Sequence, residues 1–209
     1  SMTIELLFPL IAVFVLGAMS PGPSLAVVLR NSLTGGRRHG VLTGIGHGFG
    51  FGIYAFLAAI GMVAVIASSE ALSQGLRWTG IALLVYLGII YARSAFSRDK
   101  KNTKLSSSST GRSGFIEGML IAILNPKILA WMLAIYSPFI DSDFSTPTLL
   151  GIAAVGMFID STWYTSVALF LTSNSRSAKL RSISGKIDGA MAVLMIVFAT
   201  VLGTDLLSR

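Results

Sequence analysis

The residues with the clearest chemical potential are two ionisable side chains inside long apolar segments. Lys127 stands in ILNPKILAWM, and Asp160 stands in GMFIDSTWYT. A charged side chain at the centre of a membrane helix costs about 2.5 to 3.5 kcal/mol even on lenient scales, so it usually faces the bundle interior and pairs or lines a pathway. We expect Lys127 and Asp160 to lie at similar depth, where they can pair. A buried ion pair that only fixes packing is the alternative.

Two proline motifs stand at corresponding places in the two halves of the chain. The first is AMSPGPSLAV, in which Ser20 precedes Pro21, and the second is AILNPKILAW, in which Asn125 precedes Pro126. A small polar residue followed by proline is a good N-cap with a good first helical residue, so each motif predicts a break and a helix restart. Two helix N-termini would then point to the middle of the bilayer and attract an anion. The alternative is that each proline only kinks its helix.

Further polar and aromatic residues extend this candidate site. Trp163 and Tyr164 follow Asp160 at helical spacing, which suits either plain packing or contact with a ligand ammonium. A carboxylate inside the bilayer can take up and release a proton, so Asp160 is the first candidate for proton coupling. Glu117 and His47 are the next candidates; an interfacial position for Glu117 and a packing role for His47 are their alternatives.

Composition predicts the elements that position these residues. The chain has 53% hydrophobic and 12% charged residues and a mean hydropathy of +0.76, which is typical of a membrane protein with several spans. It contains no cysteine, so no disulfide and no thiolate metal site can form. Six apolar runs are long enough to cross a bilayer, at about 4–29, 41–67, 78–97, 115–140, 147–172 and 188–208.

The order of these runs predicts an all-α membrane protein made of two three-helix repeats. Residues 1–97 form the first repeat and residues 115–209 the second, joined by a basic, Ser-rich cytoplasmic loop at 98–114. Because three is an odd number of crossings, the second repeat must be inverted relative to the first. The first and fourth helices are expected to be broken at the proline motifs.

The second run is rich in glycine at helical spacing. Four glycines recur every fourth residue, a serial pattern of small residues that lets another helix approach closely. We therefore expect a packing ridge made of Gly40, Gly44, Gly48 and Gly52.

The basic residues predict the orientation. Thirteen of the sixteen lysines and arginines follow the first, third and fifth runs, against Arg77 and Arg209 on the other side. The positive-inside rule places the thirteen in the cytoplasm and both termini outside. The net charge of +7 then needs no nucleic-acid partner. The thirteen are Arg30, Arg37, Arg38, Arg93, Arg98, Lys100, Lys101, Lys104, Arg112, Arg176, Lys179, Arg181 and Lys186.

The segments MSPGPSLAVVLRNSLTGGRRHGVLTGIGHGFGFGIYAFLAAIGM (19–62) and LNPKILAWMLA (124–134) resemble the lysine exporter (LysE/RhtB) family of bacterial amino-acid efflux proteins. The resemblance covers essentially the full length. It implies a secondary transporter in the bacterial inner membrane that exports amino acids or their derivatives in exchange for protons, without a cofactor. It leaves the amino acid and the oligomeric state open. Its motifs carry over as functional positions Pro21, Gly22, Pro23, Asn125, Pro126 and Lys127.

Rival functions fit the residues less well. An intramembrane enzyme would need a nucleophile with its base, or a metal cluster, and the chain has two histidines, no cysteine and no HExxH motif. A divalent-cation exporter of related build would want several carboxylates, and only Asp160 lies at the middle of a run. A purely structural subunit would have no use for inward charges. We therefore predict no enzyme and no metal site.

Overall fold

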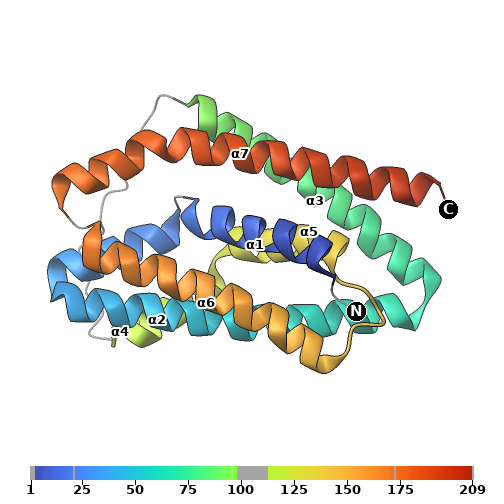
Figure 1. Ribbon diagram of the computed structural model, residues 1–209, viewed down its shortest axis with the longest axis horizontal. Helices are drawn as coiled ribbons and strands as arrows, with labels where there is room; N and C mark the ends of the chain where they lie inside the picture. The colour runs from blue at the N-terminus through green and yellow to red at the C-terminus, as the bar shows by residue number, and fades with distance from the viewer. Residues whose placement is uncertain (1–2, 21, 98–112, 172, 209) are drawn as a thin grey trace.

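Figure 1 shows the computed structural model, in which residues 3–20, 22–97, 113–171 and 173–208 are described. These residues form α-helices and no strand. The predicted cytoplasmic loop falls almost wholly outside the described residues. The helices are α1 (Ile4–Met19), α2 (Pro23–Ser68), α3 (Glu70–Phe96), α4 (Gly114–Leu124), α5 (Pro126–Phe139), α6 (Thr146–Phe170) and α7 (Asn174–Leu207).

The long helix α2 consists of two helical segments that meet at Gly36. This residue has φ 87° and ψ 169°, a backbone conformation that favours glycine because it has no side chain. The segments on either side pack against each other, since a Cβ added to Gly40 would lie 2.9 Å from the Cα of Ser32. The chain therefore makes a tight turn between Pro23–Leu33 and Gly35–Ser68.

Two pairs of helical segments are sharply bent at the proline motifs. Ile4–Met19 and Pro23–Leu33 meet at 55°, and Gly114–Leu124 and Lys127–Tyr136 meet at 57°. Among the described residues, four unbroken helices are long and apolar enough to cross a membrane, and counting each bent pair as one span gives six. The prediction of an all-α protein with several membrane spans is confirmed. The inverted relation of the two halves remains a prediction.

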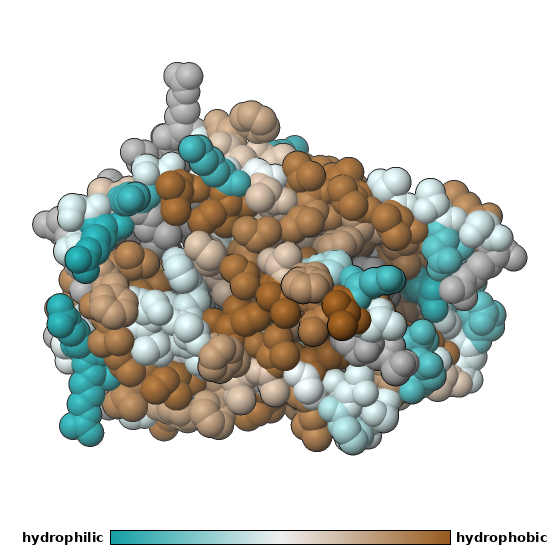
Figure 2. All heavy atoms as spheres, in the orientation of Figure 1, coloured by the Kyte–Doolittle hydropathy of each residue, from teal (hydrophilic) through white to brown (hydrophobic). Residues whose placement is uncertain are grey.

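The surface of the bundle suits a lipid environment. Figure 2 shows apolar side chains across the middle of one face and hydrophilic side chains at both ends. Large apolar side chains such as Phe8 and Phe158 are more than 70% exposed. In Figure 1, α1 begins and α7 ends at the same end of the bundle. The part of the chain that the structure describes is thus built as an integral membrane protein.

Glycines set the closest helix contacts, on two sides of α2. A Cβ added to Gly44 would lie 2.9 Å from the backbone of α6, and one added to Gly48 would lie 3.1 Å from the Cα of Ser161. Gly52 also faces α6, where an added Cβ would meet the side chain of Met157, so three of the four predicted glycines lie against this helix. The alternate glycines Gly46 and Gly50 face α4, a second ridge that we did not predict. Since side chains would separate these helices, α2 lies tightly between α4 and α6.

Candidate functional site

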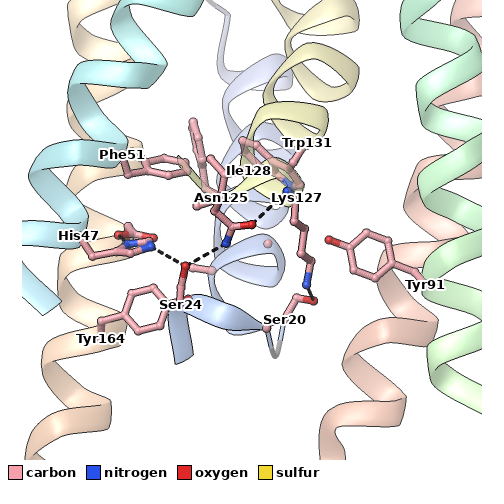
Figure 3. A pocket seen from close by; sticks show the side chains of 16 residues that line it. Ser20, Ser24, His47, Phe51, Tyr91, Asn125, Lys127, Ile128, Trp131 and Tyr164 are labelled. Carbon is pink, nitrogen blue, oxygen red and sulfur yellow. Dashed lines mark hydrogen bonds and ion pairs between the residues drawn. The ribbon is translucent and has the colours of Figure 1, made fainter. Parts of the chain in front are cut away.

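A pocket lies where the two bent pairs approach each other, near the middle of the bundle (Figure 3). Its walls come from α1, α2, α3, α5 and α6 and from the two breaks. The apolar wall includes Phe14 and Trp131, whose rings are 5.5 Å apart. Polar and charged residues face the same space, namely Ser20, Ser24, His47, Tyr91, Asn125, Lys127, Asp160 and Tyr164.

The break between α4 and α5 is capped as the sequence predicted. Asn125 precedes the first residue of α5, and its Oδ1 accepts a hydrogen bond from the backbone N–H of Lys127 at 3.0 Å. Its Nδ2 donates to Ser24 Oγ at 3.2 Å. Pro126 occupies the first helical turn, where its missing N–H costs nothing. The prediction of an N-cap followed by proline is therefore confirmed here.

The break between α1 and α2 is built differently, and the prediction that Ser20 caps a restarted helix was wrong. Ser20 instead ends α1, with its N–H bonded to the carbonyl of Leu16 at 3.0 Å. Gly22 precedes α2 in an extended conformation, and Pro23 is the first helical residue. The cause is the second proline, because the ring of Pro23 disfavours a helical Gly22 and suits the first helical position itself. Pro21 lies outside the described residues.

Lys127 extends from the start of α5 toward the first break. Its Nζ donates to Ser20 Oγ at 2.8 Å and lies 5.2 Å from the centroid of the Tyr91 ring. A Cβ added to Gly22 would lie 3.4 Å from the same nitrogen. The ammonium is therefore held between the end of α1 and α3, at one side of the pocket.

Asp160 lies on the other side, and its ion-pair partner is His47 rather than Lys127. The distance from His47 Nδ1 to Asp160 Oδ2 is 2.5 Å, and His47 Nε2 lies 2.8 Å from Ser24 Oγ. Both residues are at most 3% exposed. The expected pairing of Lys127 with Asp160 is replaced because Gly44 and Gly48 bring α2 against α6 at this level. His47 thus lines the candidate site together with Asp160.

The remaining predicted residues are divided between the pocket and its surroundings. Tyr164 lines the pocket, with its ring 4.6 Å from that of His47. Trp163 packs instead against a small apolar cluster around Val28. Glu117 accepts hydrogen bonds from Arg30 at 2.7 Å and from Asn31 at 2.8 Å, which makes a separate polar cluster between α4 and the segment before Gly36.

Sequence reasoning missed Asp188 as a member of this region. Its carboxylate accepts from Ser20 Oγ at 3.1 Å and from Ser94 Oγ at 2.6 Å, and the residue is buried. Asp188 appeared as the first residue of the sixth apolar run, where an interfacial acid is ordinary. The available signal was its place between Gly185 and Gly189, which permit a close helix contact.

Comparisons with known proteins agree with this architecture. The chain is 24% identical over 188 residues to the threonine efflux protein of Escherichia coli (strain K12), covering 89% of this chain and 91% of that protein. It is 27% identical over 184 residues to the uncharacterized membrane protein YrhP of Bacillus subtilis (strain 168), covering 83% and 88%. No solved structure matches the chain. The family model for LysE type translocators matches residues 15–206, so the chain belongs to the LysE type translocator family.

Proposed function

We propose that the protein exports amino acids from the cytoplasm and that the pocket between the two breaks binds the substrate. The observation that carries the proposal is the charge pattern of the lining: an ammonium from Lys127 and a carboxylate from Asp160 face one largely buried pocket. These are the counter-charges of an amino-acid zwitterion. The family and the similarity to a threonine efflux protein support the same substrate class.

In this proposal the substrate carboxylate binds at Lys127. The ammonium of Lys127 and the N-terminal end of α5 both present positive potential, and water screens charges poorly in a buried pocket. Ser20, Gly22 and Asn125 lie around this end of the pocket. The helices that begin at Pro23 and Pro126 are expected to orient these groups.

The substrate ammonium then approaches Asp160, with Tyr164 beside it. The apolar wall, which includes Phe51, Ile128 and Trp131, receives the substrate side chain. A hydrophobic pocket discriminates weakly between side chains that differ by a methyl group or hydroxyl. We therefore expect this wall to accept a set of amino acids and not a single one.

Proton antiport is proposed for the contact between His47 and Asp160. The two side chains are in hydrogen-bond contact, and in this proposal they hold a proton that an arriving substrate ammonium displaces. Asp160→Asn keeps the shape but not the charge, so we expect it to abolish uphill export in liposomes with an imposed pH difference. Downhill exchange of substrate for substrate should persist at a higher apparent KM, because the substrate ammonium loses its carboxylate partner but exchange needs no proton. If the variant still accumulates substrate, the coupling group lies elsewhere, at His47 or Glu117.

Counterflow in liposomes tests the function itself. Purified protein is reconstituted with one unlabelled compound inside, and uptake of the labelled compound is followed over a panel of amino acids and divalent cations. We expect stimulation by a set of amino acids and none by the cations. A hard cation would need several carboxylates, and Asp160 is the one carboxylate among the described residues that line the pocket. Counterflow of a metal ion alone would favour the cation exporter.

We further propose that both termini lie outside a bacterial inner membrane and that the two halves form inverted repeats. The bends of 55° and 57° at corresponding motifs support the repeat, and the basic loops support the orientation. Because the chain has no cysteine, single cysteines report topology directly. An impermeant thiol reagent should label Ser145→Cys in intact cells and not Ser108→Cys, a position outside the described residues. The reverse pattern would invert the orientation.

A further inference from the structure

Asp188 is a second buried carboxylate beside the pocket, and substrate binding as proposed above does not use it. It lies on α7, is 6% exposed, and accepts hydrogen bonds from Ser20 at 3.1 Å and from Ser94 at 2.6 Å. Small residues bring α7 against α3 here: a Cβ added to Gly185 would lie 3.3 Å from the carbonyl oxygen of Ala95. An ionised carboxylate in such a place requires a nearby positive charge.

That charge is the ammonium of Lys127, reached through the hydroxyl of Ser20. Lys127 Nζ donates to Ser20 Oγ at 2.8 Å, and Ser20 Oγ donates to Asp188 Oδ1 at 3.1 Å. A hydroxyl can donate one hydrogen bond and accept others, so Ser20 can accept from Lys127 and donate to Asp188 at the same time. The ammonium and the carboxylate are no farther apart than these two bonds laid end to end, and Asp188 attracts Lys127 electrostatically.

We propose that Asp188 is the resting counter-ion of Lys127 and that the substrate carboxylate competes with it for this ammonium. The empty site then holds two separate charge pairs, Lys127 with Asp188 beside α3 and α7, and His47 with Asp160 between α2 and α6 (Figure 3 labels Lys127, Ser20 and His47). This inference rests on the proposed substrate site. Asp188 acts through Lys127 and is a positioning residue that sets how tightly the substrate is held.

A double-mutant cycle on thermal unfolding in detergent tests the pairing without any transport measurement. Lys127→Met and Asp188→Asn each leave one buried charge uncompensated, so each should lower the Tm by about 5 °C or more. The double variant removes both charges and should recover at least half of the summed loss. Lys127→Met with Asp160→Asn is the matched control and should be additive, because Asp160 pairs with His47.

Additive losses in the Lys127→Met and Asp188→Asn cycle would overturn the pairing. If Asp188→Asn alone does not fold, the double variant still decides, since the proposal requires the second substitution to rescue folding. A double variant that also fails to fold would count against it.

Transport kinetics test the competition. Asp188→Asn removes the competitor, so the apparent KM for export should fall about threefold or more while the maximal rate also falls, because release becomes slower. An unchanged or higher KM would contradict competition. Absence of transport by the wild-type protein would refute the proposed function instead. The thermal unfolding cycle would still test the pairing of Lys127 with Asp188, because it needs no transport measurement.

Discussion

The two breaks use the same sequence pattern, a polar residue followed by proline, for different purposes. At the second break the side chain of Asn125 serves the backbone, since it caps α5 through the N–H of Lys127. At the first break the backbone of Ser20 closes α1, and its hydroxyl is left to connect two charged groups. The second break is therefore a structural support for Lys127, whereas the first break holds the ammonium of Lys127 in place.

The largest effect is expected at Lys127, the residue on which both breaks converge. Lys127→Met keeps the apolar stem and removes the charge, so export should fall about 100-fold or more because the substrate carboxylate loses its partner. Reconstituted transport at matched protein amounts measures this. The variant should remain monodisperse in detergent; a well-folded variant that exports at the wild-type rate would remove Lys127 from the site.

Asn125→Ala tests the supporting role of the second break. It removes the cap of α5 and the bond to Ser24, so we expect the free energy of unfolding to fall by about 1 to 2 kcal/mol. Thermal unfolding in detergent measures the loss. Asn125→Ser is the matched control, because serine also caps helices and should restore most of the stability. Equal stability of Asn125→Ala and wild type would show that the cap is dispensable.

Ser20→Ala tests the other role at the first break. The bond to Leu16 comes from the backbone N–H, so α1 keeps its end, and any loss of Tm should come from the two charged groups that lose the hydroxyl between them. The apparent KM should rise about three- to tenfold, because the ammonium loses the hydroxyl that holds it at the pocket. Ser20→Thr retains the hydroxyl and serves as the control. A large Tm drop with an unchanged KM would make the two breaks equivalent.

The smallest effect is expected at Gly22→Ala. The φ of Gly22 is −176°, which any residue adopts, and the added Cβ would lie 3.4 Å from Lys127 Nζ, close to an ordinary contact. Export should stay within about twofold of wild type, because displacing the flexible end of a lysine costs little. Complete loss of export would instead mean that the substrate needs the space left by glycine at this break.

Local signals were enough to predict where both breaks lie, but the cap at only one of them. The apolar runs and the Asn125 cap depend on a few adjacent residues, and both are as predicted. The prediction that Ser20 caps a helix was wrong because Pro21 and Pro23 both suit the first helical position. A pattern centred on one proline does not decide between them.

The charge pairs could not be predicted because they depend on helix packing. Asp160 and Lys127 share a plausible depth, but the glycines of α2 place His47 closer to Asp160. Asp188 resembled an interfacial acid, because the burial of its side chain depends on α3, which precedes it in sequence by almost half the chain. A residue pattern predicts the depth of a charged side chain in the membrane and its spacing along the helix. Its partner is decided by the residue that lies across the helix interface.

The glycine-lined sides of α2 also bear on how the protein is made. His47 and Asp160 are 113 residues apart, so a ribosome working at about 5–20 residues per second needs roughly 6 to 23 s to synthesise the partner of this histidine. Throughout that time the helix that carries His47 lacks the part of α6 that holds Asp160, and it also lacks α4 until residue 124 has been made. The nascent chain therefore passes through a stage in which His47, which is 1% exposed in the folded protein, still lacks its carboxylate partner.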